Sequence, residues 1–384
     1  MIGAVVRVVA AAALAGGHGF FDQATVSSRV AARPAARSAA APPVSRLSLQ
    51  QLAGQRIIYA YAGLKPPASL TAAVRAGEAA GVILFAPNIA SRAQVRATVA
   101  GLQRASLASP VHMRLLVLTD QEGGEVRRLP GAPALSEKQI GTSANPLAQA
   151  RAAGAGAGAN LAGAGVNVNL APVLDVFRQP DNFIDEFQRS YSRRPAAAAS
   201  LGAGFISAQQ RLRVAATAKH FPGLGAAGRG QNTDLGPVTL TTSLAAIRST
   251  DEAPYRSAIA AGVKLVMTSW ARYPALDRRW PAGLSPAVIG GELRRRLRFR
   301  GVTITDGLDA GAVTPFGNLS QRGVLAAAAG ADLILCAAPL PSENTPAQGI
   351  TARRALATAL ARHRLSLSAA RQSAARVLAL RASP

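Results

Sequence analysis

The segment VAATAKHFPGLG, residues 214–225, joins a short apolar run to a sharp turn and sets Lys219 and His220 side by side at the junction. The apolar part, residues 214–218, predicts a buried strand, and the Pro-Gly pair that follows the two polar residues turns the chain. Polar groups at a strand end are typical of the mouth of a rigid barrel, although a buried structural corner would also use them. The segment therefore predicts a site where a strand ends.

Short apolar runs of the same kind recur along the chain, with segments between them that are long enough for crossover helices, such as Leu70–Ala80 and Ser285–Leu297. Nearly continuous apolar runs are typical of strands buried on both faces. Eight such units predict an α/β fold, a single-domain (β/α)8 barrel of TIM type, with a doubly wound open sheet as the alternative. The runs are Arg56–Tyr61, Val82–Phe85, Leu115–Leu118, Val166–Leu170, Val214–Ala218, Lys264–Thr268, Val302–Thr305 and Asp332–Leu335.

The charge of the chain is strongly positive. The 384 residues include 43 Lys and Arg but only 19 Asp and Glu, which gives a formal net charge of +24. Such a charge could attract nucleic acid, an anionic membrane or an anionic wall polymer. The arginines are scattered and are not interleaved with aromatic residues, so we predict no nucleic-acid partner. The run Arg294–Arg298 is predicted to be a solvated helix face.

Residues 1–44 are predicted to be a leader of signal-peptide type followed by an Ala/Pro-rich linker. The apolar stretch Val5–Gly16 is too short for a membrane span, so we expect no integral span in the mature form. This predicts a secreted or cell-envelope protein whose catalytic domain is residues 45–384. The single cysteine, Cys336, lies in an apolar run and is predicted to be an inert core thiol.

A glycine-rich segment, Gly154–Gly165, loosely matches a dinucleotide-binding fingerprint. It precedes a predicted strand instead of following one, so no helix N-terminus would meet a pyrophosphate. Its small residues are predicted to let a helix pack closely on the sheet.

Charged and hydrogen-bonding residues follow five of the predicted strands. Unpaired polar groups in such places are costly unless a ligand satisfies them, so we expect a ligand site at this end of the barrel. The sets are Asp120–Gly124 with Arg127 and Arg128, Asp175 with Arg189–Tyr191, Lys219 with His220, Ser269–Pro274, and Asp306–Asp309.

Together with AKHFPGLG, the motifs LTDQEGGEVRRL, GVNVNLAPVLDV and GVTITDGLDAGAV make the chain resemble glycoside hydrolase family 3, in its β-N-acetylhexosaminidase branch, from Leu47 to Leu380. The resemblance implies a (β/α)8 barrel with no metal or organic cofactor. It also implies a retaining exo-β-N-acetylglucosaminidase that hydrolyses terminal β-linked N-acetylhexosamine through a covalent glycosyl-enzyme. We expect a secreted monomer that acts on cell-wall or chitin-derived saccharides, with a role in carbohydrate metabolism and peptidoglycan turnover.

The resemblance implies roles for individual residues. Asp306 matches the catalytic nucleophile, although an Asp after a strand could also be a helix N-cap. Asp175 matches a carboxylate that orients Lys219 or Arg189 from behind the site, or a structural ion pair. The groups that surround the sugar are matched by Asp120, Arg128, Arg189, Lys219 and His220.

The loop at residues 226–237 departs from the family pattern. The family carries an Asp-Ser/Thr-His triplet there, whose histidine is the general acid/base, whereas this loop has no histidine and reads Asn232-Thr233-Asp234 at the matching place. We therefore expect Asp234 to be the acid/base, with its pKa raised by burial or by the nucleophile; a loop-capping role is the alternative. Trp270 also replaces a common histidine, and it could stack on a sugar or pack in the core.

Other activities remain open at this point. A β-glucosidase or β-xylosidase of the same family often carries a second, sandwich domain. After the eighth predicted strand this sequence has only one predicted helix, Ala352–Leu380, so we expect no sandwich domain. Phosphorolysis is disfavoured because a carboxylate at position 234 would repel phosphate. A non-catalytic protein that binds amino sugars is the alternative from another functional class.

Overall fold

Eight apolar runs form a closed ring of parallel strands in the computed structural model, which describes residues 44–383. The strand order is β10-β1-β2-β3-β6-β7-β8-β9, and a parallel bridge between Ile304 and Leu333 joins the two ends. This closure confirms the barrel and excludes the open doubly wound sheet. The barrel strands are β1 (Ile57–Tyr59), β2 (Gly81–Ile83), β3 (Leu116–Thr119), β6 (Val168–Asn169), β7 (Ala215–Phe221), β8 (Leu265–Thr268), β9 (Val302–Thr305) and β10 (Ile334–Cys336).

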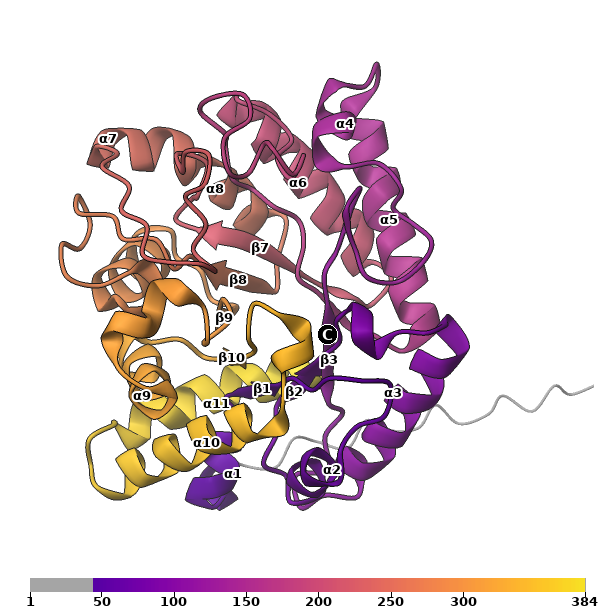
Figure 1. Cartoon of the computed structure of the whole chain (residues 1–384), viewed down its shortest axis with the longest axis vertical. Helices are drawn as coiled ribbons and strands as arrows, with labels where there is room; N and C mark the ends of the chain where they lie inside the picture. The colour runs from indigo at the N-terminus through magenta and orange to yellow at the C-terminus, as the bar shows by residue number, and fades with distance from the viewer. Residues whose placement is uncertain (1–43, 384) are drawn as a thin grey trace, which may run out of the picture. The chain divides into compact units, whose positions relative to one another are not determined.

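Helices surround the strands (Figure 1). The helix expected over Leu70–Ala80 ends at Arg75, and the one expected over Ser285–Leu297 is the π-helix η5 (Ala287–Arg296). The prediction of a single last helix over Ala352–Leu380 is wrong: one helix ends at Ala361, and a second begins at Leu367. The α-helices are α1 (Leu49–Gly54), α2 (Ala68–Arg75), α3 (Arg92–Leu107), α4 (Glu137–Thr142), α5 (Pro146–Ala164), α6 (Pro195–Gln210), α7 (Leu244–Ala246), α8 (Ala253–Ala260), α9 (Leu319–Ala329), α10 (Pro346–Ala361) and α11 (Leu367–Ala382).

A short antiparallel hairpin, β4 (Gln121–Gly123) with β5 (Val126–Arg127), was not predicted from the sequence. Gly123 ends β4 and Gly124 begins the turn, both at positive φ, where a side chain would be strained. The hairpin returns the chain so that the backbone N–H of Arg128 donates to the carbonyl of Asp120 at 3.2 Å. It therefore places both residues at the carboxyl end of β3.

The glycine-rich segment lies in helix α5, as predicted, but its close contact is with α6 and not with the sheet. A Cβ atom added at Gly154 would clash with the backbone of Phe205, and one added at Gly158 would lie 3.1 Å from the carbonyl oxygen of Gln209. The small residues therefore allow two neighbouring helices to approach at backbone distance.

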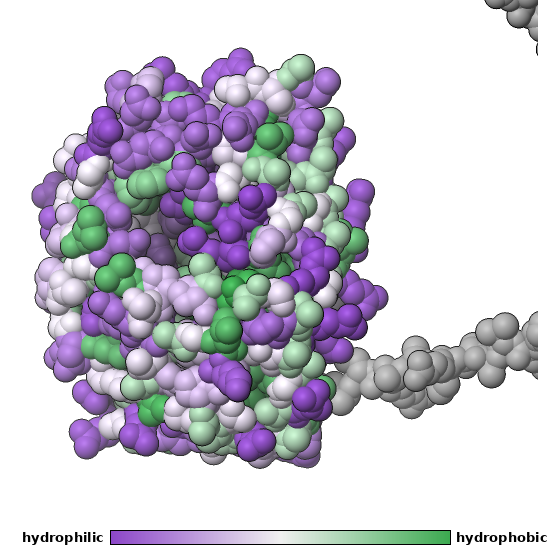
Figure 2. Space-filling model, turned by 45° about the vertical axis from the view of Figure 1, so that its right-hand side comes forward, coloured by the Kyte–Doolittle hydropathy of each residue, from purple (hydrophilic) through white to green (hydrophobic). Residues whose placement is uncertain are grey.

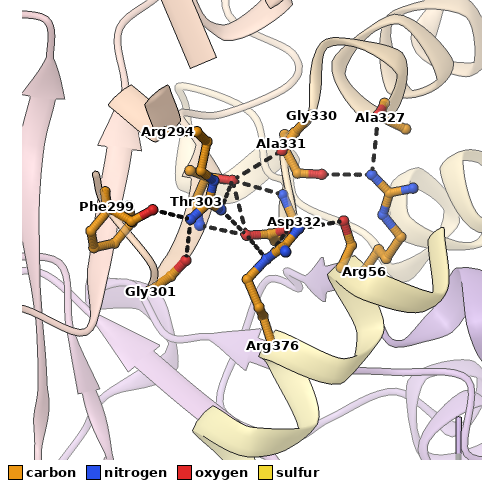
Figure 3. Close-up of polar contacts among 11 residues, drawn as sticks. Arg56, Arg294, Phe299, Gly301, Thr303, Ala327, Gly330, Ala331, Asp332 and Arg376 are labelled. Atoms are coloured by element: carbon orange, nitrogen blue, oxygen red, sulfur yellow. Dashed lines mark hydrogen bonds and ion pairs between the residues drawn. The ribbon is translucent and has the colours of Figure 1, made fainter. Parts of the chain in front are cut away.

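Helix α11 closes the amino end of the barrel. Its Val377 and Leu380 belong to the apolar cluster that fills the ring of strands. Beside them, the buried carboxylate of Asp332 accepts hydrogen bonds from Arg294 of η5 and Arg376 of α11, and from the backbone N–H of Thr303 at 3.0 Å (Figure 3). This group of contacts ties η5, β9 and α11 together.

The arginine run in η5 is not simply a solvated helix face, so that prediction is wrong in part. Arg294 points to Asp332, and Arg296 pairs with Glu252 and Glu292, so two of its arginines neutralise buried acids. Arg295 and Arg298 are exposed as expected. The run therefore combines inward ion pairs with outward charges.

The leader prediction falls on residues 1–43, which lie outside the described residues. Within residues 44–383, the helices are all too short or too polar to span a bilayer. Cys336 is buried, and burial raises the pKa of its thiol well above the usual range, so the described environment suits an inert core residue.

Candidate active site

A cavity of about 190 Å³ opens at the carboxyl ends of the barrel strands. Figure 2 shows the surface hollowed there, with hydrophilic residues on much of the rim. Seven of the eight site residues predicted from the sequence line this cavity, and Asp175 lies behind it. The seven are Asp120, Arg128, Arg189, Lys219, His220, Asp234 and Asp306.

The floor of the cavity is a chain of buried ion pairs. Lys219 Nζ lies 2.8 Å from Asp120 Oδ1 and 2.7 Å from Glu122 Oε1. Glu122 also accepts two hydrogen bonds from Arg189, each 2.9 Å long. Such a bidentate pair fixes the guanidinium plane as well as its charge. The four side chains therefore hold one another in a single arrangement.

Each charge in this floor is stabilised by its neighbours. Burial alone would raise the pKa of Glu122, but Arg189 and Lys219 outweigh it and lower that pKa to about 2. Burial alone would lower the pKa of Lys219, but Asp120 and Glu122 raise it above its ordinary value. Lys219 thus stays a cation and Glu122 an anion across the working range of pH.

Strand β7 brings two successive side chains to the cavity. Successive residues of a regular strand face opposite sides, so Lys219 and His220 could not both line one cavity in such a strand. The pairing of β7 with β8 shifts register between Ala218 and Phe221, and this irregularity spans the two residues. A local break in the ladder therefore re-aims one of them.

Asp175 holds His220, and not the Lys219 or Arg189 expected from the sequence. Its fully buried carboxylate accepts from His220 Nδ1 at 2.8 Å, from the backbone N–H of His220 at 3.2 Å and from that of Leu224 at 2.6 Å. Because a carboxylate only accepts, Nδ1 carries a proton and the orientation of the ring is fixed. Asp175 is thus a positioning residue behind the cavity.

Asp306 stands at the end of β9 with its carboxylate largely free. One oxygen accepts a hydrogen bond from the backbone N–H of Gly307 at 2.8 Å. The helix N-cap alternative is wrong, because the next helical turn begins at Gly311 and its N-cap position is Ala310. Within residues 44–383, Asp306 forms no ion pair. Its carboxylate is therefore available to a ligand in the cavity.

The loop that carries Asp234 is docked onto the segment that follows Asp306. The carbonyls of Thr233 and Asp234 accept hydrogen bonds from Ala312 N–H at 3.0 Å and Gly311 N–H at 2.8 Å. In the described part of the chain, no group donates to the Asp234 carboxylate, so its side chain does not cap the loop. Backbone bonds therefore place a free carboxyl group near Asp306.

The two carboxyl groups influence each other. Desolvation in the cavity, and then the negative charge of Asp306, raise the pKa of Asp234 to about 6. The residue as a whole remains exposed, so its carboxyl group can still exchange a proton with solvent. A carboxyl group with such a pKa is suited to general acid/base work near neutral pH.

Trp270 packs in the core and does not stack on a sugar, the other role that the sequence left open. Its side chain is buried and lies behind the cavity wall, and its Nε1–H donates to the carbonyl of Gly307 at 2.7 Å. It does not line the cavity and offers no face to a sugar. Trp270 instead fixes the backbone next to Asp306.

Sequence reasoning missed two acidic residues of the site. Glu122 stands two residues after Asp120 in the same quoted motif, and this adjacency was a usable signal. Glu137, at the start of α4, is buried and accepts from Val173 N–H at 2.8 Å, and burial and then the charge of Glu122 raise its pKa. Nothing local in the sequence marked Glu137. Among the described residues, no group of acidic, His or Cys side chains is arranged to hold a metal ion.

Comparison with known sequences shows that this chain is similar to glycosidases. The profile described as "Glycosyl hydrolase family 3 N terminal domain" matches residues 46–380. A protein of Arthroderma benhamiae named an uncharacterized secreted glycosyl hydrolase is 44% identical over 89% of this chain and 96% of its own length. A β-hexosaminidase of Nitrosomonas eutropha is 34% identical over 66% of this chain and 72% of its own.

Solved structures agree. A family 3 β-N-acetylglucosaminidase of a Paenibacillus species superposes with a TM-score of 0.80 at 33% identity, covering 87% of this chain and 62% of that one. The chain thus spans less than two thirds of that enzyme. A β-N-acetylhexosaminidase of Beutenbergia cavernae superposes with a TM-score of 0.77 at 30% identity, covering 87% of this chain and 98% of its own.

Proposed function

The chain belongs to glycosyl hydrolase family 3, and we propose that it is a retaining exo-β-N-acetylglucosaminidase that releases terminal β-linked N-acetylhexosamine. Its named relatives include β-hexosaminidases and β-N-acetylglucosaminidases, and these support the choice of sugar. The observation that carries the proposal is the pair of free carboxyl groups, Asp306 and Asp234, in one cavity over a floor of buried charges.

The two carboxyl groups divide the reaction between them. Asp306 attacks the anomeric carbon, and the C–O bond to the leaving group breaks as Asp234 gives its proton to the departing oxygen. Asp234, now a carboxylate, then takes a proton from water, and the resulting hydroxide equivalent displaces Asp306 from the sugar. The raised pKa of Asp234 keeps the proton available for the first step.

The floor of the cavity holds the sugar in place for this attack. Lys219 and Arg128 donate to hydroxyl and carbonyl oxygens, while the partly exposed Asp120 accepts from sugar hydroxyls. His220 lines the same wall, with its ring held by Asp175. Glu122 touches no ligand space but keeps Lys219 and Arg189 charged and aligned.

We further propose that the enzyme is secreted as a monomer and trims cell-wall or chitin-derived fragments. The predicted leader and the secreted Arthroderma relative support export. A cavity of about 190 Å³ suits removal of one terminal sugar at a time. Gel filtration at several concentrations tests the monomer, and mass spectrometry of the mature chain tests cleavage of the leader.

The deciding experiment is hydrolysis of a chromogenic N-acetylglucosaminide by the wild type beside Asp306→Asn. We expect turnover in the wild type, with release of β-N-acetylglucosamine as the first product by NMR, and no turnover in the variant. Preference for a glucoside or xyloside in the same panel would overturn the choice of sugar. Tight binding of N-acetylglucosamine with no turnover by the wild type would identify a binding protein instead.

A further inference from the structure

Five exposed cations gather at the amino end of three neighbouring strands, opposite the cavity. They lie in the connections that lead into β7, β8 and β9 (residues 211–214, 261–264 and 297–301), which contain no acidic residue. Within the described chain, none of the five forms an ion pair. We call them the cation arc: Arg211, Arg213, Lys264, Arg298 and Arg300.

Backbone and side-chain bonds join the three connections into one surface. Gln210 accepts from Lys264 N–H at 3.1 Å and donates to the carbonyl of Gly262 at 2.9 Å, which links the entries to β7 and β8. The carbonyl of Lys264 accepts from Val302 N–H at 2.9 Å, which links the entries to β8 and β9. Three adjacent strands span about 10 Å, so the arc is continuous on the scale of a polymer repeat.

The arc differs from the arginines of the adjoining helix η5 in having no acidic partners among the described residues. In η5, next to the arc, Arg294 and Arg296 pair with acids. The arc residues lack such partners, so their like charges repel one another in the free protein. Arg213 and Arg298 also occupy positive φ (57° and 58°), where glycine would cost less. An anionic ligand would remove the repulsion.

We propose that the cation arc binds a flexible acidic polysaccharide whose carboxylate or phosphate groups pair with the arginines. Four of the five members are arginines, whose planar guanidinium groups bind such oxyanions in bidentate fashion. The single aromatic residue of the three connections, Phe299, is buried, so the arc offers no platform on which nucleic-acid bases could stack. Because the arc and the cavity lie at opposite ends of parallel strands, a bound polymer leaves the mouth open.

The test compares two variants with the same loss of charge. The arc variant carries Arg211→Gln, Arg213→Gly, Lys264→Gln, Arg298→Gly and Arg300→Gln; glycine suits the two positive-φ positions. The control variant replaces with glutamine five exposed arginines outside the arc that form no ion pair within the described chain: Arg75, Arg96, Arg104, Arg354 and Arg362. Thermal melting by circular dichroism confirms that both are folded, whether or not either hydrolyses a glycoside.

Binding to polygalacturonate is measured over a range of salt concentrations. We expect the arc variant to lose at least tenfold in affinity at low salt and to show a flatter dependence on salt, while the control stays within about threefold of the wild type. An equal loss in both variants would overturn the proposal, because net charge alone would then explain binding. Tighter wild-type binding to oligodeoxythymidylate than to polygalacturonate at equal charge would also overturn it in favour of nucleic acid.

Discussion

The barrel carries a cluster of charged side chains at each end, and the two clusters differ in how completely their hydrogen-bonding capacity is satisfied. At the amino end, Asp332 is surrounded by Arg294, Arg376 and Thr303, which leave no acceptor capacity for a ligand (Figure 3). At the carboxyl end, Asp306 receives one backbone hydrogen bond and Asp234 none to its carboxyl group. Both ends use the same chemical groups, but only one leaves them unpaired.

Within the cavity at the carboxyl end, paired and unpaired charged groups also form two separate layers. Its floor, built on Glu122, Lys219 and Arg189, is as fully paired as the Asp332 cluster. Above the floor stand the carboxyl groups that are free to react. The paired charges fix the geometry of the site, and the few unpaired groups carry out the chemistry. Unpaired polar groups cost stability, so they are retained where a substrate supplies their missing partners.

The largest expected effect is on the unpaired layer. Asp306→Asn should lower kcat/KM by about 10⁴-fold or more, because the nucleophile is lost, while the free energy of unfolding changes by less than about 1 kcal/mol. Steady-state kinetics and urea unfolding measure the two effects. The matched control is Asp309→Asn, three residues on, which removes the charge that pairs with Arg322 and one of the two oxygens that accept from Arg322 and Gln348, and should affect stability more than turnover. Comparable turnover loss in both would remove Asp306 from its role.

The amino-end cluster should respond in the opposite way. Asp332→Ala leaves Arg294 and Arg376 without their counter-charge and should lower the free energy of unfolding by about 3–5 kcal/mol. Turnover per folded molecule should stay near that of the wild type. Urea titration and active-site counting test this, with the exposed Glu343→Ala as control. A loss below about 1 kcal/mol would mean that the cluster is not structural.

Asp234→Asn should lower kcat by about 10²- to 10³-fold on substrates with poor leaving groups and much less on activated ones. Since Asp234 must be protonated to act as the acid, and its pKa is about 6, wild-type kcat/KM should fall as pH rises through 6. The variant should lack this limb. The exposed Asp181→Asn serves as control, and a variant profile that keeps the limb would assign the acid to another group.

The smallest expected effect concerns the paired floor in acid. The folded pKa of Glu122 is about 2 against an ordinary 4.5, so it contributes stability above pH 4.5 that is lost as pH falls toward 2. The difference corresponds to about 3 kcal/mol at most. Glu122→Gln should flatten the dependence of unfolding free energy on pH in that window, whereas the exposed Glu125→Gln should leave it unchanged. Parallel curves for all three proteins would contradict the assignment.

Much of the fold was accessible from local pattern. Each of the eight barrel strands overlaps one of the predicted apolar runs, because a strand buried on both faces needs a largely apolar run wherever it occurs. The β4–β5 hairpin and the break between α10 and α11 were missed, since they depend on backbone turns with weak local signals. Motifs likewise pointed to seven residues that do line one cavity.

The sequence by itself determined the strand positions, the family and which residue types meet at the mouth, because these follow from periodicity and motif order along the chain. Only the tertiary structure decided which groups are partners: that Asp175 holds His220, that Glu122 joins Lys219 to Arg189, and that Asp332 collects two arginines. These contacts connect residues far apart in the chain. The identity of a partner, and with it whether a charge is paired or free to react, depends on distances through space that no local pattern encodes.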